Sequence, residues 1–274
     1  MVPLFAALSH RAVIQLSGSD KVAFLQGLVT NDVTKAGPEC LVYAALLTPQ
    51  GKFLHDLFIF ERDGDWWIDC ERDRASDLIK RLSLYRLRCD VQLFDASQDY
   101  AVYVGWGGYS HGITDPRLPE MGTRIYLPAH EIPPFPLAPL EAYDSHRLAL
   151  GIPDGSRDIP IEKGIILECG FDELGAIDWD KGCYLGQELT ARTRYRGLVR
   201  KRLLPVKIDG EAPPPGIPVF LGDDPVGEMR SATADYGLAL LRLATIRQTL
   251  PVLTAGQNRL IPFVPGWMKL PQEE

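Results

Sequence analysis

Residues 12–94 form a regular succession of strand-like and helix-like segments, which restricts the possible folds more than any other feature. Apolar runs typical of strands occupy 12–18, 41–47, 53–60, 65–70 and 91–94, whereas helical spacing of apolar residues occupies 21–29 and 74–87. The Arg62-Asp63-Gly64 turn predicts that 53–60 and 65–70 form a hairpin. We interpret residues 1–95 as one ferredoxin-like unit of the order β-α-β-β-α-β.

The next hundred residues repeat this order in a weaker form. Strands are expected at 100–106 and 124–127, and the glycine-rich stretch between them predicts turns in place of a helix. Four prolines within 132–139 predict an extended link, and a helix is expected over 140–150. We therefore expect a second, abbreviated ferredoxin-like unit over residues 96–200.

After residue 200 the chain changes to short strand-like runs separated by prolines and glycines. These runs lie at 203–208, 219–221, 226–231, 237–242 and 260–263. Short strands separated by such turn residues are typical of a small β-barrel. We therefore place a C-terminal β-barrel domain at residues 201–274.

The charge balance and the cysteines exclude several classes of protein. With 36 acidic and 29 basic residues the net charge is −7, which argues against a general nucleic-acid coat. The five cysteines (Cys40, Cys70, Cys89, Cys169 and Cys183) contain no CxxC pair, so we expect neither a zinc framework nor a disulfide scaffold. We expect no signal peptide, and the sequence contains no run of about 18 apolar residues. We expect a cytoplasmic protein without a membrane partner.

The stretch 181–202, KGCYLGQELTARTRYRGLVRKR, is the strongest candidate for a functional site. Cys183 follows Lys181 in a glycine-rich turn, and a nearby cation favours the thiolate form of a cysteine. Gln187 and Glu188 add an amide and a carboxylate side by side. The alternative interpretation is a tight turn whose cysteine is merely buried.

The same stretch resembles a known family. KGCYLGQE, continued by ELTARTRYRG, closely resembles the signature of the YgfZ-type folate-binding proteins, which are iron–sulfur cluster assembly factors related to the T protein (aminomethyltransferase) of the glycine cleavage system. FLQGLVTND at 24–32, TPQGKFLHDLFIF at 48–60, RLALGIP at 147–153 and LECGFDELGAIDWD at 167–180 agree in order. The resemblance covers residues 13–202, with a weaker match at 226–242.

The resemblance implies an α+β fold of three domains, like that of the T protein. Tandem ferredoxin-like units would surround a central cavity, followed by a small C-terminal β-barrel. The cavity would bind tetrahydrofolate or one of its one-carbon derivatives.

Particular residues carry over with the resemblance. Asp56 lies where the T protein has its catalytic aspartate and would act as a general acid or base, with His55 as its partner. Tyr143 and Arg11 occupy positions that are aromatic in the YgfZ branch, and the guanidinium that Arg11 substitutes there can stack on a flat ring such as that of folate. Further folate contacts are expected from Lys181, Gln187, Glu188, Arg192 and Arg194.

Two departures from the T protein favour the assembly-factor branch. Ala149 stands where the T protein has an acidic residue that contacts the pterin, and the T protein lacks the cysteine that corresponds to Cys183. Iron–sulfur clusters usually take about four protein ligands. Cys183 alone therefore predicts a reactive or transiently ligating thiol and no resident metal.

The basic residues that follow the cysteine motif have several interpretations. They are Arg192, Arg194, Arg196, Arg200, Lys201 and Arg202. Alternation at 192, 194 and 196 would place three arginines on one face of a strand. Such a face would bind the glutamate tail of folate, a protein or RNA, or it would be a solvated connector to the barrel. The acidity of the whole chain disfavours RNA.

The sequence therefore supports three functions. The first, which we expect, is a tetrahydrofolate-binding accessory protein for the assembly or repair of iron–sulfur enzymes, with those enzymes or other assembly proteins as partners. In this function Cys183 is a reactive thiol near the folate cavity, and the protein is no conventional enzyme. The second is a folate-dependent one-carbon (aminomethyl) transferase that uses Asp56. The third is a tRNA- or protein-binding module that uses the basic residues 192–202.

Overall fold

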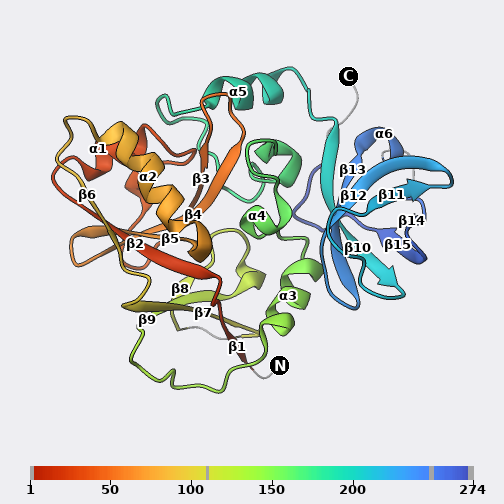
Figure 1. The fold of residues 1–274 in the computed structure, drawn as a ribbon, viewed down its shortest axis with the longest axis horizontal. Coiled ribbons are helices and arrows are strands. Elements are labelled where there is room, and N and C mark those ends of the chain that lie inside the picture. Colours follow the sequence, from red (N-terminus) through yellow and green to blue (C-terminus); the bar gives the residue numbers. More distant parts are fainter. Residues whose placement is uncertain (1–2, 109–110, 247–249, 271–274) are drawn as a thin grey trace. The chain divides into compact units, whose positions relative to one another are not determined.

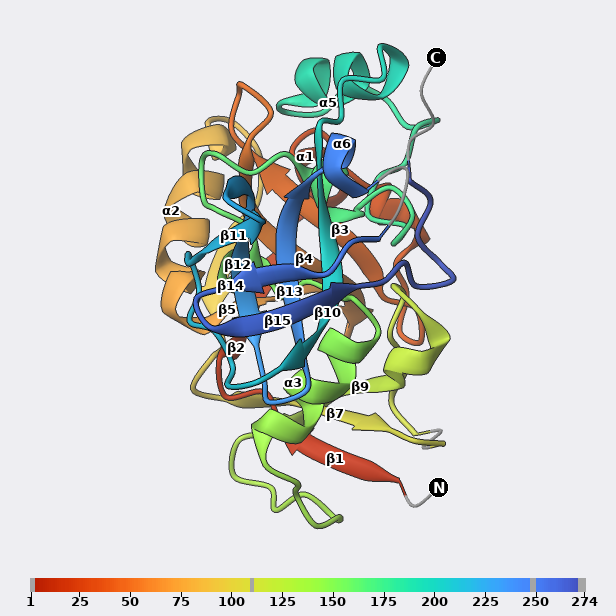
Figure 2. The ribbon, with the colours of Figure 1, turned by 90° about the vertical axis from the view of Figure 1, so that its right-hand side faces the viewer.

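The computed structural model describes residues 3–108, 111–246 and 250–270 (Figure 1 and, turned by 90°, Figure 2). The chain forms two compact units, and each unit consists of two segments that are separate in the sequence. Unit 1 consists of Met1–Leu140 and Leu174–Gln187, and unit 2 consists of Glu141–Glu173 and Glu188–Glu274. The division into three domains at residues 95 and 200 stays a prediction. No helix in the described ranges is long and apolar enough to cross a bilayer.

Unit 1 contains a five-stranded antiparallel sheet with the order β3-β4-β5-β2-β6. Its strands are β2 (Arg11–Ser17), β3 (Val42–Leu47), β4 (Phe53–Arg62), β5 (Asp65–Glu71) and β6 (Gln92–Asp95). Its helices are α1 (Lys21–Gln26) and α2 (Ala75–Arg86), with 3-10 turns at Val33–Lys35 and Arg72–Arg74. The segments agree with those predicted, but the predicted order omitted one strand. The strand β3 lies at the sheet edge as an addition to the four strands of a ferredoxin-like unit.

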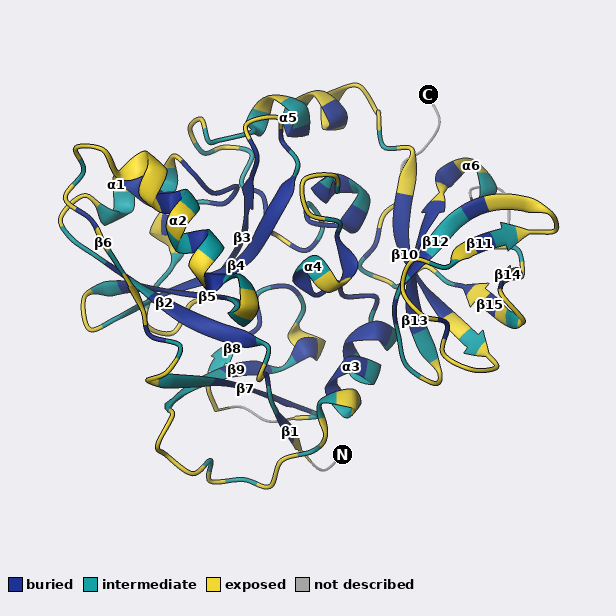
Figure 3. Cartoon of the chain, viewed as in Figure 1, coloured by how far each residue is buried: buried dark blue, intermediate teal, exposed yellow. Residues whose placement is uncertain are grey.

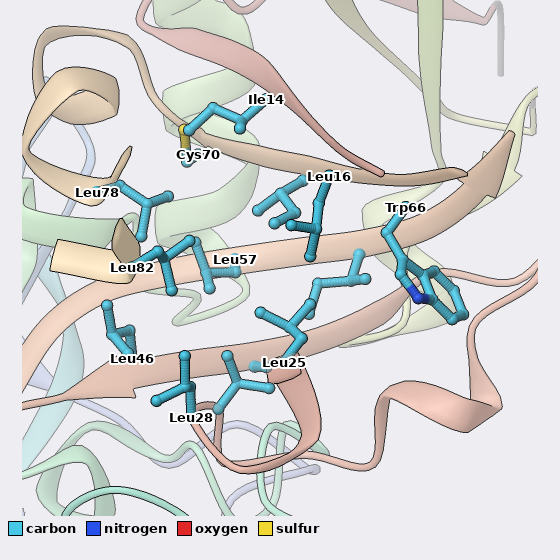
Figure 4. Close-up of a cluster of buried hydrophobic side chains, with 14 of the residues drawn as sticks. Ile14, Leu16, Leu25, Leu28, Leu46, Leu57, Trp66, Cys70, Leu78 and Leu82 are labelled. Carbon is cyan, nitrogen blue, oxygen red and sulfur yellow. The ribbon is translucent and has the colours of Figure 1, made fainter. Parts of the chain in front are cut away.

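The two faces of this sheet differ in chemistry because strand side chains alternate. On one face, Ile14, Leu57 and Cys70 pack in an apolar cluster with Leu78 and Leu82 of α2 (Figure 4). The opposite face carries charged side chains. The strand β4 is buried from residue 53 to 60 because both of its faces are covered, which explains why its sequence alternates only in part (Figure 3).

The second sheet of unit 1 joins the N-terminal segment to the middle of the chain. It has the order β1-β7-β9-β8, with β1 (Leu4–Ala7), β7 (Tyr100–Trp106), β8 (Ile113–Thr114), β9 (Thr123–Pro128) and a 3-10 turn at Pro119–Met121. The strands β7 and β9 agree with the predicted strands, and the described residues between them contain no α-helix. The pattern did not predict β1, which pairs antiparallel with β7.

Unit 2 contains a closed barrel with the strand order β10-β13-β12-β11-β14-β15. Its strands are β10 (Lys201–Asp209), β11 (Pro218–Leu221), β12 (Asp224–Ala232), β13 (Tyr236–Arg242), β14 (Leu253–Ala255) and β15 (Asn258–Pro262). Side chains such as Leu204, Met229 and Leu241 fill its core. The predicted C-terminal barrel is confirmed, with β14 as a strand that the sequence pattern did not predict.

Short helices complete the described chain. They are α3 (Leu140–Ala149), α4 (Gly155–Asp158), α5 (Gln187–Tyr195), α6 (Leu243–Ile246) and a 3-10 turn at Ile166–Cys169. Because Arg192 and Arg194 lie on α5, the prediction of a strand through Arg192, Arg194 and Arg196 is wrong. An α-helix has about 3.6 residues per turn, so Arg192 and Arg196 share a side and Arg194 points elsewhere.

Candidate functional site

The cysteine motif forms a loop in unit 1 that docks on the segment after α1. The Leu185 N–H donates to the Gly27 carbonyl at 3.1 Å. Gly186 has a φ of +80°, and a Cβ atom at this position would lie 2.4 Å from the carbonyl oxygen of Thr48. Only glycine allows both this backbone conformation and this close approach.

Lys181 holds the beginning of the loop. Its ammonium group donates to the carbonyl oxygens of Gln26 (2.9 Å), Val29 (2.8 Å) and Asn31 (2.7 Å). Partial burial lowers the pKa of Lys181 to about 8, whereas the negative charges of Asp32 and Asp178 oppose that shift. All three donors of the ammonium group are engaged, so Lys181 clamps the loop. Its effect on the Cys183 thiolate stays a prediction.

Exposure separates the cysteines. Cys183 is exposed, and so is Cys40, a second thiol of unit 1 that the sequence analysis did not single out. Cys70 and Cys169 are buried, and burial raises the pKa of both thiols, that of Cys169 to about 12. Exposure fits the expected reactivity of Cys183, since reactive cysteines are accessible to solvent.

Gln187 and Glu188 have different surroundings. The side-chain carbonyl oxygen of Gln187 accepts a hydrogen bond from the Tyr184 N–H at 2.9 Å and closes the loop. Glu188 lies 3.4 Å from Arg192, one turn later on α5, and 89% of its side chain is exposed. The amide therefore stabilises the loop, whereas the carboxylate faces solvent.

Asp56 and Arg11 form a buried ion pair on the charged face of the first sheet. Arg11 Nη1 donates to Asp56 Oδ1 at 2.9 Å, and Arg11 Nε donates to Asp69 Oδ1 at 2.7 Å. Arg124 of β9 donates to the other Asp69 oxygen at 2.6 Å. These charged hydrogen bonds join the two sheets of unit 1.

The network continues beyond Arg124. Asp115 accepts hydrogen bonds from Arg117 at 2.7 Å and from Arg124 at 3.4 Å. The guanidinium carbons of Arg11, Arg117 and Arg124 lie 5.5, 4.9 and 3.5 Å from the centroid of the Phe58 ring. The arginines and aspartates balance in charge, as burial of ionised groups requires. Sequence analysis missed Asp69, Asp115, Arg117 and Arg124, because no sequence spacing connects them.

This network bears on the expected folate pocket. Arg11 is fully buried and serves two aspartates, which does not fit the predicted stacking of its guanidinium on a ligand ring. Asp56 Oδ2, in contrast, is buried and has no hydrogen-bond partner among the described residues. A ligand N–H group would satisfy this oxygen. Tyr143 is buried in unit 2, whereas Asp56 belongs to unit 1.

His55 is not the partner of Asp56. Adjacent side chains of β4 point to opposite faces of the sheet, and His55 Nε2 lies 3.0 Å from Asp77 Oδ2 on α2. Burial, followed by the charge of Arg74, lowers the pKa of His55 to about 3. The imidazole is therefore neutral at pH 7.

The RLALGIP segment has a structural role in unit 2. Arg147 donates to Asp144 at 2.6 Å and to Asp158 at 2.7 Å. Asp158 also accepts a hydrogen bond from the backbone N–H of Ser231 at 3.0 Å, which ties α4 to the barrel strand β12. Removal of Arg147 would leave the buried Asp158 carboxylate without its ion-pair partner.

The basic residues after the motif fall into two groups. Arg202 is buried and donates to Glu173 at 2.6 Å and to the Leu167 carbonyl at 3.0 Å, so its role is structural. Arg194 lies 3.7 Å from Asp172. The exposed group is Arg192, Arg194, Arg196, Arg200 and Lys201.

Comparisons with known proteins identify the family. The CAF17 C-terminal beta-barrel domain matches residues 200–270. The mitochondrial iron–sulfur cluster assembly factor IBA57 homolog of Mycosarcoma maydis is 33% identical to this chain, over 96% of this chain and 84% of its own length. The chain belongs to the IBA57 family. Mouse IBA57, also named mitochondrial, is 31% identical over 95% of this chain and 84% of its own.

The fold of this IBA57-family chain is also found in a solved structure. Glycine cleavage system aminomethyltransferase T from Bartonella henselae has a TM-score of 0.69 and covers 95% of this chain and 84% of its own. Its sequence identity of 13% shows a common fold and nothing finer. The predicted relationship to YgfZ-type assembly factors and to the T-protein fold is therefore confirmed.

Proposed function

We propose that this protein is an assembly factor for iron–sulfur enzymes and that Cys183 is its cluster-handling thiol. The supporting observation is an exposed Cys183 on a loop that Lys181 and Gly186 fix to unit 1. Its relatives are named iron–sulfur cluster assembly factors. A fixed but exposed thiol is suited to meet a metal centre that a partner carries.

In this function the cluster is cargo. Iron–sulfur clusters usually take about four protein ligands, and the described residues contain no group of three or more metal-binding side chains. Cys183 therefore contributes one thiolate, and a donor or recipient protein contributes the other ligands. The three hydrogen bonds of Lys181 keep the loop in place during this encounter.

We test this proposal by rescue of iron–sulfur enzyme activity in cells that lack their own assembly factor. Cys183→Ala is expected to abolish rescue, whereas Asp56→Asn retains it. Cys40→Ala is the matched control, because Cys40 is also exposed in unit 1. Full rescue by Cys183→Ala would refute the proposed role of this thiol.

We also propose tetrahydrofolate, or a one-carbon derivative, as a ligand. Asp56 Oδ2 would accept a hydrogen bond from a folate N–H group, and the support is its burial without a described partner. When bound, the folate would supply a carrier for a one-carbon unit. Calorimetric titration with tetrahydrofolate tests this: Asp56→Asn is expected to weaken binding, and wild-type affinity in this variant would exclude Asp56 as a folate contact. Tyr143→Ala separately tests the folate contact that the family resemblance implies for Tyr143.

The second candidate function is aminomethyl transfer with Asp56 as the acid or base. The unpartnered Oδ2 favours it, whereas the ion pair between Oδ1 and Arg11 opposes it, because the carboxylate already neutralises a buried cation. In the rescue experiment, loss of function in Asp56→Asn together with full function in Cys183→Ala would favour the transferase.

The proposed compartment is a reducing one, because all five cysteines are free. The cytoplasm is our starting proposal, while the relatives in Mycosarcoma maydis and mouse are named mitochondrial. Fractionation of cells that express the tagged protein distinguishes the two compartments.

A further inference from the structure

Unit 2 carries exposed cations that the described structure leaves without acidic partners. Arg196, Arg200, Lys201 and Arg242 are exposed, and none forms an ion pair with another described residue. Arg202, in the same segment, is buried against Glu173. Glu173 therefore pairs with a buried arginine and does not neutralise these four exposed cations.

Lys201 and Arg242 lie directly opposite each other on the paired strands β10 and β13. Side chains of directly opposed residues project from the same face of a sheet, and like charges in this position repel each other. Arg200 adjoins the pair, because its carbonyl accepts a hydrogen bond from the Leu243 N–H at 2.9 Å. A negatively charged ligand would relieve this repulsion.

The three cations border a cavity of about 450 Å³ within unit 2. The other lining residues are Gly197, Val199, Leu243 and Ala244, and none of the described lining residues is acidic. The cavity therefore combines positive charge with aliphatic surface. An occupant needs carboxylate or phosphate groups next to apolar groups.

Exposed apolar side chains precede the cavity residues in the chain. Tyr195 is 76% exposed and Leu198 is 42% exposed, and α5 and the segment after it are largely solvent-accessible (Figure 3). Tyrosine and arginine are enriched at protein–protein interfaces and among their energetic hot spots. This composition fits a protein partner better than a small anion.

We propose that Tyr195, Arg196, Leu198, Arg200, Lys201 and Arg242 form a docking surface, here called the basic surface, for an acidic segment of a partner protein. This inference rests on the proposed function only for the identity of the partner, which would be a protein that donates or receives an iron–sulfur cluster. The paired N–H donors of an arginine guanidinium match the two oxygens of a carboxylate. The exposed Tyr195 and Leu198 beside the cations favour a protein occupant, because a protein segment can present apolar side chains together with its carboxylates.

The test is fluorescence anisotropy with the purified full-length protein and a fluorescein-labelled peptide of alternating glutamate and leucine. The double variant Lys201→Glu with Arg242→Glu is expected to weaken binding by about tenfold or more. The matched control is Lys207→Glu with Arg259→Glu, which makes the same change of charge at exposed positions of the same barrel. This control is expected to bind within about twofold of wild type.

Three outcomes would overturn the proposal. They are equal binding by wild type and the Lys201/Arg242 variant, equal binding of a glutamine–leucine peptide, and tighter binding of a single-stranded RNA than of the acidic peptide. Cys183→Ala is expected to bind the peptide as wild type does. Failure of the basic surface is therefore distinguishable from failure of the proposed cluster function, which the rescue experiment tests separately.

Discussion

The ammonium nitrogen of Lys181 lies 2.7 Å from the carbonyl oxygen of Asn31, 150 residues earlier in the chain. Together with the hydrogen bonds to Gln26 and Val29, this contact holds the ammonium group of Lys181 against backbone carbonyls at the end of α1 and just after it. The lysine that the sequence suggests as an activator of Cys183 thus has a clear structural task.

Substitution Lys181→Met is expected to lower the free energy of unfolding by about 1.5–3 kcal/mol. Methionine has a side chain of similar length but cannot donate the hydrogen bonds of the charged ammonium group. Urea denaturation measures the change. Lys35→Met is the control: Lys35 pairs with Asp178 at 2.6 Å, but its side chain is 60% exposed, so a loss below about 1 kcal/mol is expected. Equal losses in both variants would contradict the clamp.

Gly186→Ala is expected to destabilise unit 1 by at least about 1–2 kcal/mol, because alanine disfavours positive φ. The added Cβ would also lie 2.4 Å from the Thr48 carbonyl oxygen. Gly182→Ala is the matched control in the same loop, since a Cβ there meets nothing within 4 Å. Denaturation curves of the two variants should therefore differ, and similar curves would argue against the close approach.

Stability is expected to fall as the pH drops from about 6.5 toward 3, because of His55. Its pKa is about 3 in the folded chain against 6.5 ordinarily, so the unfolded chain binds the proton first. The stabilising contribution is thus present above pH 6.5 and is lost in acid. His55→Gln should reduce the loss between pH 7 and pH 4 by up to about 3 kcal/mol. Parallel pH profiles of the two proteins would show that His55 titrates normally.

Alkylation rates should separate the cysteines. Near neutral pH, Cys183 and Cys40 are expected to react with iodoacetamide at least about tenfold faster than Cys70 and Cys169, because burial raises the pKa of the latter two thiols. Peptide mass spectrometry follows each site. If Lys181 also activates Cys183, Cys183 reacts faster than Cys40, and Lys181→Met slows Cys183 alone. Equal rates for both exposed thiols would show that Lys181 holds the loop in place but does not activate Cys183.

Local patterns predicted the strands whose partners are close in the chain. The β4–β5 hairpin is an example, because Asp63 and Gly64 both adopt positive φ in the turn that the sequence suggests. The four residues of β1 pair with β7, about a hundred residues later, so no local signal identifies them. Alternating arginines after Thr190 suggested a strand, although the segment is helical up to Tyr195.

The candidate site was predictable to the same extent. A contiguous motif identified Cys183, and its exposure agrees with that choice. The surroundings of Asp56 were not predictable, because Arg11, Asp69 and Arg124 come from three strands and meet only when two sheets pack. Pairing of this kind depends on tertiary structure, which residue spacing does not contain.

The division of both units into two segments has a consequence for synthesis. A ribosome completes residues 141–173 of unit 2 before it supplies Leu174–Gln187, the last part of unit 1. The carbonyls of Gly27, Asn31 and Thr48 therefore gain their contacts with the loop that carries Cys183 only after residues 141–173 have been synthesised. Translation order thus makes the loop that carries Cys183 the last part of unit 1 to be supplied, so a chain that stops before residue 183 cannot display this thiol.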